Sequence, residues 1–61
     1  MSASNIILIQ KRDEGYVAQE VNMDTGLILT EIESGNKSKV VESAVRYAAN
    51  NEVEYGIKDE S

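Results

Sequence analysis

The tripeptide Asp24-Thr25-Gly26 is the one short motif in this chain that could belong to a catalytic site. Aspartic proteases carry such a loop, in which two facing aspartates share one proton so that one acts as base and the other as acid. One copy of this chain supplies a single aspartate of this kind, and a symmetric dimer could supply the second. We favour a turn between two strands, because Asn22 interrupts the apolar run that would bury a catalytic loop. A tripeptide match is also common by chance.

The other residue types offer little for catalysis or metal binding. The chain has no histidine and no cysteine, which excludes disulfides and the zinc, copper and haem sites that need these ligands. Asp13 and Glu14 are adjacent carboxylates in an expected turn, where such pairs are usually solvated rather than bound to calcium. No serine has an evident base beside it, and no glycine-rich phosphate loop occurs. We therefore predict that the protein is not an enzyme and binds no cofactor or metal.

Length and charge limit the class of protein further. With 61 residues the chain forms one domain, 1–61, with frayed termini at 1–4 and 59–61. A domain of this size buries only about 60% of its unfolded surface, so we expect support from a homodimer or another partner. The 11 acidic and 6 basic residues give a net charge of −5. That charge disfavours direct nucleic-acid binding, which needs a basic stripe, and suits a basic partner.

No segment of the sequence predicts a membrane span or a secretory signal. The longest apolar run near the start, 6–9, is far shorter than the roughly 18 residues that a span requires. The first residues lack the basic segment that begins a signal peptide. We therefore expect a cytoplasmic protein without membrane association.

Three strands are expected first along the chain, at 5–11, 16–22 and 27–33. They are rich in β-branched residues and are separated by the turn-forming segments RDEG and NMDTG. Because side chains alternate between the faces of a strand, 5–11 and 27–33 carry apolar residues on both faces.

The period then changes from strand-like to helical over 37–51. Either Asn36 or Ser38 could cap the start of this helix, and Glu42 and Arg46 form a favourable pair one turn apart. The apolar stripe that predicts the helix consists of Val40, Val41, Ala44, Val45 and Ala48.

A fourth strand is expected at 52–58, where Val53, Tyr55 and Ile57 alternate with polar residues and face the core. The predicted fold is therefore α+β: a small antiparallel sheet, β-β-β-α-β, with one helix packed on one face. One helix covers one face, so the apolar residues of the other face predict an interface. A homodimer, formed by face packing or by edge pairing, or a partner protein would cover it.

An exposed aromatic residue and outward carboxylates are the candidate contacts of that interface. Tyr16 begins its strand on what the sequence suggests is the polar face, and exposed aromatic residues are favoured interface anchors. Tyr47 lies beside the helical stripe, where it would close the core or reach a neighbouring molecule. The candidate partner-binding residues are Tyr16, Glu20, Glu31, Glu33, Glu52 and Glu54.

Two segments resemble known families. IQKRDEGYVAQEV, residues 9–21, resembles the opening hairpin of HicB-type antitoxin N-terminal domains, although NMDTG stands where that family has P-x-x-P-G. The resemblance implies a partial ribonuclease-H-like fold that docks on and silences a small RNA-cleaving toxin, with Gly15, Tyr16 and Ala18 as structural hairpin residues. SAVRYAANNEVEYGIKD, residues 43–59, is similar to the closing helix and strand of small uncharacterised bacterial β-β-α-β domains, which implies the fold and no activity.

These observations together predict a non-enzymatic protein-binding regulator or inhibitor of antitoxin or phage anti-defence type. It would block a surface of a larger protein, such as one that handles nucleic acid, with help from electrostatic attraction to a basic groove. Two other classes stay open. A nucleic-acid-binding accessory protein would retain single strands in a salt-sensitive way, and a structural subunit would assemble into a defined oligomer by itself.

Overall fold

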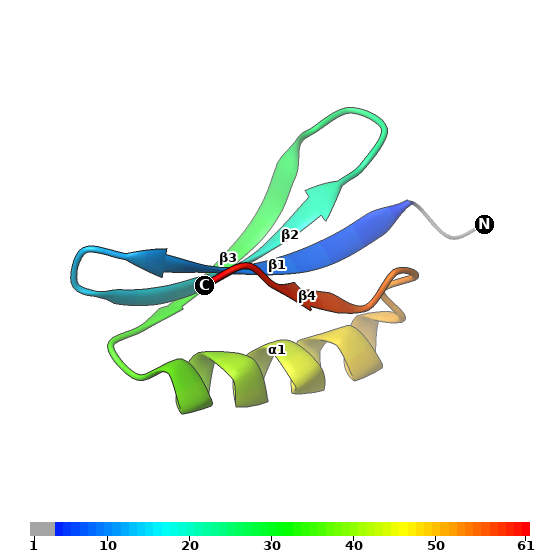
Figure 1. The fold of residues 1–61 in the computed structure, drawn as a ribbon. Coiled ribbons are helices and arrows are strands. Elements are labelled where there is room, and N and C mark those ends of the chain that lie inside the picture. The colour runs from blue at the N-terminus through cyan, green and yellow to red at the C-terminus, as the bar shows by residue number, and fades with distance from the viewer. Residues whose placement is uncertain (1–3) are drawn as a thin grey trace.

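The computed structural model describes residues 4–61 and confirms the α+β class. Within these residues one four-stranded sheet has the strand order β3-β2-β1-β4, and one helix lies across one of its faces (Figure 1). The elements are β1 (Asn5–Arg12), β2 (Gly15–Asn22), β3 (Ile28–Ser34), α1 (Lys37–Asn51) and β4 (Ile57–Asp59).

The sheet is mixed, because β4 runs parallel to β1 while the other two pairs are antiparallel. The reason is the length of α1. A helix of 15 residues rises about 22 Å, which returns the chain to the end of the sheet where β3 began. The next strand therefore runs in the direction of β3 and β1, and it pairs with the open side of β1.

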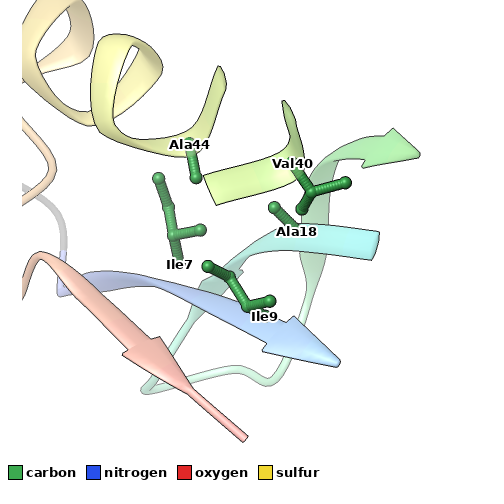
Figure 2. Packing of buried hydrophobic residues seen from close by; sticks show 5 residues of the cluster. All are labelled: Ile7, Ile9, Ala18, Val40 and Ala44. Carbon is green, nitrogen blue, oxygen red and sulfur yellow. The ribbon is translucent and has the colours of Figure 1, made fainter. Parts of the chain in front are cut away.

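The core lies between α1 and the face of the sheet that we call the helix face (Figure 2). Its buried apolar side chains are at most 2% exposed, and they come from β1, β2 and α1: Ile7, Ile9, Ala18, Val40 and Ala44. The predicted helical stripe is narrower than expected, since Val41 and Ala48 are half-buried and Val45 is 54% exposed. Partly buried residues from the sheet, from α1 and from the connection after it pack against this core.

The register of β1 and β2 assigns each side chain to a face. Ile7 pairs with Glu20 and Ile9 pairs with Ala18, and residues directly opposite one another in a ladder point to the same side. Tyr16, Ala18 and Glu20 therefore lie on the helix face, and the prediction that Tyr16 begins β2 on a polar outer face is wrong. The other side of the sheet, which no described element covers, is called the open face.

The helix begins and ends through local hydrogen bonds. The side-chain oxygen of Asn36 accepts from the backbone N–H of Ser38 at 2.9 Å and of Lys39 at 3.4 Å, so Asn36 rather than Ser38 is the N-cap. At the other end Glu52 adopts the left-handed conformation, with φ of 51°, and its N–H donates to the carbonyl of Ala48.

The last strand is shorter than the predicted 52–58 and consists of Ile57–Asp59. The helix stops at a left-handed residue, so the chain must turn through 53–56, with Gly56 at φ of 70°, before it reaches β1. Tyr55 lies in this turn and is 55% exposed, so the prediction that it is a core residue is wrong.

The ends of the described chain make backbone hydrogen bonds to the sheet. Asp59, which the sequence places in a frayed tail, belongs to β4, and the N–H of Glu60 donates to the carbonyl of Ile9 at 2.8 Å. At the other end the carbonyl of Ser4 accepts from the N–H of Met23 at 2.7 Å. The rest of the predicted frayed start, residues 1–3, lies outside the described residues.

Candidate protein-binding surface

The segment that contains Asp24-Thr25-Gly26 is the turn between β2 and β3. The side-chain oxygen of Asn22 accepts from the N–H of Asp24 at 2.9 Å and of Thr25 at 3.1 Å, which is an Asx turn. Gly26 has a φ of 77° and donates its N–H to the carbonyl of Asn22 at 2.7 Å. The polar residue that interrupts the apolar run is thus the residue that organises the turn.

A bulge in β3 follows this turn. Glu20 faces Thr30, but its neighbour Val21 faces Ile28, so Leu29 is an additional residue on the β3 side. Two consecutive apolar residues therefore stand opposite one residue of β2. Neither is buried, since Ile28 is 53% and Leu29 is 52% exposed.

An apolar patch results at this end of the open face and along the adjoining hairpin. Ile6, Val21 and Ile28 lie side by side on β1, β2 and β3, and Leu8 follows Ile6 on the same face. Met23 and Leu27 flank the turn at 56% and 61% exposure. We define the apolar patch as Ile6, Leu8, Val21, Met23, Leu27, Ile28 and Leu29.

The opposite end of the open face is covered by its own polar side chains. Val17 is fully buried although no helix covers it, because it lies between Gln10 of β1 and Glu33 of β3. Beside it Gln19 donates to the carboxylate of Glu31 at 2.6 Å. Val17 is therefore shielded from water, whereas four residues of the apolar patch, Met23, Leu27, Ile28 and Leu29, are more than half exposed.

Three of the predicted contact residues, Tyr16, Glu31 and Glu33, lie along the C-terminal half of β3 or beside it. Glu31 and Glu33 are exposed on the open face, as expected, and Glu31 forms an ion pair with Arg12 at 3.5 Å. Tyr16 is half-buried, with the ammonium of Lys37 5.9 Å from its ring centre. Tyr16 and Glu33 share a shallow cavity of about 270 Å³, which is lined by Arg12, Glu14, Gly15, Tyr16, Glu33, Ser34 and Gly35.

The other predicted contact residues do not join this group. Glu52 and Glu54 are exposed, but they belong to the connection between α1 and β4. Glu20 is only 9% exposed, and the prediction that it points outward is wrong.

Glu20 is the centre of a polar cluster between the sheet and α1. Its carboxylate accepts from the side-chain amide of Asn5 at 2.8 Å and from the hydroxyl of Tyr47 at 2.6 Å. The Tyr47 hydroxyl also lies 3.2 Å from the Thr30 hydroxyl. Because buried polar groups are costly unless hydrogen-bonded, this cluster fixes α1 on the sheet rather than serving a partner. The position of Tyr47 beside the helical stripe was its one signal in the sequence.

The ionisation of Tyr47 is the direct test of this cluster. The hydrogen bond to the Glu20 carboxylate raises the pKa of Tyr47 above the usual 10.0, and the contact with Thr30 opposes part of that rise. In a Y16F/Y55F background, where Tyr47 is the remaining tyrosine, we expect Glu20→Gln to shift the absorbance titration at 295 nm to lower pH.

The raised pKa of Tyr47 also makes the stability of the protein depend on pH, and a control variant completes the titration. Since the folded pKa of Tyr47 lies above its unfolded value, the stability linked to protonated Tyr47 is fully present below about pH 10 and is lost as the pH rises through the folded pKa. Glu33→Gln, which removes an exposed carboxylate outside the cluster, should leave the titration in place. An unchanged Tyr47 pKa in Glu20→Gln would contradict the hydrogen-bonding scheme.

Other chemistry on the described residues is sparse. Hydrogen bonds from Ser61, together with a smaller contribution from Lys37 at 3.0 Å, lower the pKa of Asp59 to about 2. Within 4–61, no three carboxylates gather in a way that could hold a metal ion. No helix in this part of the chain is long and apolar enough to cross a membrane.

Comparisons with known proteins identify no relative of this chain. No family model, no curated protein and no solved structure matches the chain.

Proposed function

We propose that the protein is a non-enzymatic protein-binding regulator that docks through the apolar patch and blocks a surface of a larger protein. The observation that carries this proposal is the exposure of Met23, Leu27, Ile28 and Leu29, each more than half exposed within one hairpin. Contiguous apolar surface with a polar margin marks interaction sites, because water contact is unfavourable for it. The contrast with the shielded end of the same face supports a docking role for the patch.

The charge of the chain supports a basic target. Its net charge is −5, and exposed carboxylates of Asp24, Glu31 and Glu33 lie on the same hairpin as the patch. Opposite charge speeds encounter and disfavours wrong partners. A nucleic-acid-handling protein offers a basic groove of this kind, so we propose an inhibitor of antitoxin or anti-defence type acting in the cytoplasm. The likeness of 9–21 to HicB-type hairpins agrees with that class.

A homodimer is the second candidate, and one observation favours it. The sheet-to-helix core contains five buried apolar residues, which is little for an independently stable domain. A second copy seated on the apolar patch would add to that core. The net charge of each copy opposes this association, so the heterologous partner is preferred.

The test compares two sets of apolar-to-serine variants. Leu27→Ser with Leu29→Ser alters the patch, and Val45→Ser removes an equally exposed apolar side chain from α1. Each protein is used as bait in nuclease-treated host lysate, and its mass in solution is measured by light scattering. We expect one protein to be retained by the wild type and by Val45→Ser, and to be weakened at least about tenfold by the patch variant.

Each other outcome points to a different class. A wild-type dimer that only the patch variant dissociates would establish the homodimer. Salt-sensitive retention of single-stranded nucleic acid without any protein would favour the accessory-protein class. A monomer that retains nothing, or a partner lost equally in Val45→Ser, would overturn the proposal.

A further inference from the structure

We infer that the free edge of β3 accepts an extended basic segment of the partner protein as an additional strand. The inference rests on the proposed function and names the chemistry of the partner. In the strand order β3-β2-β1-β4, no strand from 4–61 pairs with the outer side of β3. Of the two edge strands, β3 has seven residues and β4 has three. The longer edge presents the backbone donors and acceptors that strand addition requires.

The side chains of β3 decide which strand can be added. Glu31 and Glu33 are both exposed on the open face. Two copies could pair their β3 strands antiparallel along the full length of the strand if the pairing were centred on Glu31. The Glu31 carboxylates of the two copies would then lie directly opposite each other. Centring the pairing on Ile32 instead sets Glu31 against Glu33. Like charges directly opposite one another destabilise a ladder, so the edge disfavours a second copy and selects a basic strand.

Glu33 is the more available of the two carboxylates, because the Oε2 atom of Glu31 accepts from Gln19 at 2.6 Å and pairs with Arg12. Glu33 takes part in none of the ion pairs found within 4–61. The ion pair of Glu31 with Arg12 is about half exposed on each side, and pairs of this kind contribute little and exchange readily.

The alternation of β3 also limits the residues between the basic positions. On the helix face β3 presents Thr30, Ile32 and Ser34, which pair with Glu20, Ala18 and Tyr16. Ile32 is half-buried against the core. An added strand would therefore place its intervening side chain beside Ile32, where an apolar residue extends the core. The partner segment should read basic, apolar, basic, with lysine or arginine two residues apart.

The experiment uses synthetic peptides and amide chemical shifts of the full chain. The probe alternates lysine and valine, and its controls are a glutamate–valine peptide, a lysine–valine peptide of shuffled order, and an alternating lysine–valine peptide N-methylated to block ladder bonds. We expect shifts along β3 with the probe alone. Glu31→Gln with Glu33→Gln should weaken binding by about threefold to tenfold. Glu52→Gln with Glu54→Gln changes the net charge equally and should have no effect.

Several results would overturn the inference. Equal weakening by the two double variants would mean unspecific attraction, and equal binding of the shuffled or N-methylated peptide would mean that no ladder forms. Shifts confined to α1, or no binding at millimolar peptide, would contradict it directly. The proposed function is judged separately by the Leu27→Ser and Leu29→Ser variant. If a protein partner depends on the apolar patch but the lysine–valine peptide does not bind, the proposed function is supported and the edge site is not. If the peptide binds along β3 but no partner depends on the patch, the edge site is supported and the proposed function is not.

Discussion

Replacing Ile7 by alanine is expected to lower the free energy of unfolding by about 2–5 kcal/mol. Ile7 is 1% exposed and belongs to a core of only five buried apolar residues. Truncation removes buried hydrocarbon and leaves a cavity that the rigid sheet and helix cannot fully close. A domain of this length has a free energy of unfolding of roughly 3–9 kcal/mol, so this one substitution should remove a large part of it. Urea unfolding followed by circular dichroism measures the effect.

The control for this prediction is the next residue of the same strand. Leu8 has a side chain of the same size, lies on the open face, and is half-buried rather than buried. Leu8→Ala should therefore cost about 1 kcal/mol, because less surface returns to water. Equal losses in the two variants would contradict this prediction and would mean that the open face is covered as completely as the helix face, as a second copy on the apolar patch would cover it.

Replacing Gly15 by alanine is expected to lower the free energy of unfolding by about 1–3 kcal/mol. A Cβ atom at Gly15 would lie 2.5 Å from the carbonyl oxygen of Ser34 and 2.9 Å from the Cα of Gly35. Both atoms belong to the backbone, so no side chain can rotate away to make room. The first turn and the end of β3 would have to separate, which would also deform the cavity beside Tyr16 and Glu33.

Thermal unfolding measures this loss, since each kcal/mol shifts the midpoint by about 4–8 °C in a domain of this size. Gly35→Ala is the matched control, because the nearest atom to a Cβ there is 3.9 Å away. That variant should unfold within a few degrees of the wild type. If Gly15→Ala were equally mild, the close approach of the two backbones would contribute nothing to stability.

Local patterns predicted most of the elements correctly. The change of period at Lys37 and the side chain of Asn36 determine the helix over 37–51 without any information about the rest of the fold. The three strands of the meander are predicted to within one residue at each end because turn residues separate them. The sequence also showed that the strands carry more apolar residues than one helix can cover. The apolar patch contains many of these uncovered residues.

The errors concern relations between distant residues. Alternation groups Tyr16 with Ala18 and Glu20, but only the pairing with Ile7 and Ile9 shows that this group faces the helix. The alternation of Val53, Tyr55 and Ile57 is compatible both with a strand and with a turn. The left-handed residue that ends α1 decides between the two, and the amino-acid composition does not predict it. The bulge at Leu29 likewise depends on the register of two strands.

The parallel pairing of β4 with β1 affects how the native protein opens. This contact joins Ile7 to Ile57, near the two ends of the described chain, so it closes a longer loop than either hairpin does. It is held by a strand of three residues, and short segments with few contacts open at the lowest free energy. Amide protons bonded across this pair, such as that of Ile7 to the carbonyl of Gly56, should exchange with solvent sooner than those of the β1–β2 ladder. During each such opening β1 also becomes an edge, and the sheet briefly presents two long free edges instead of one.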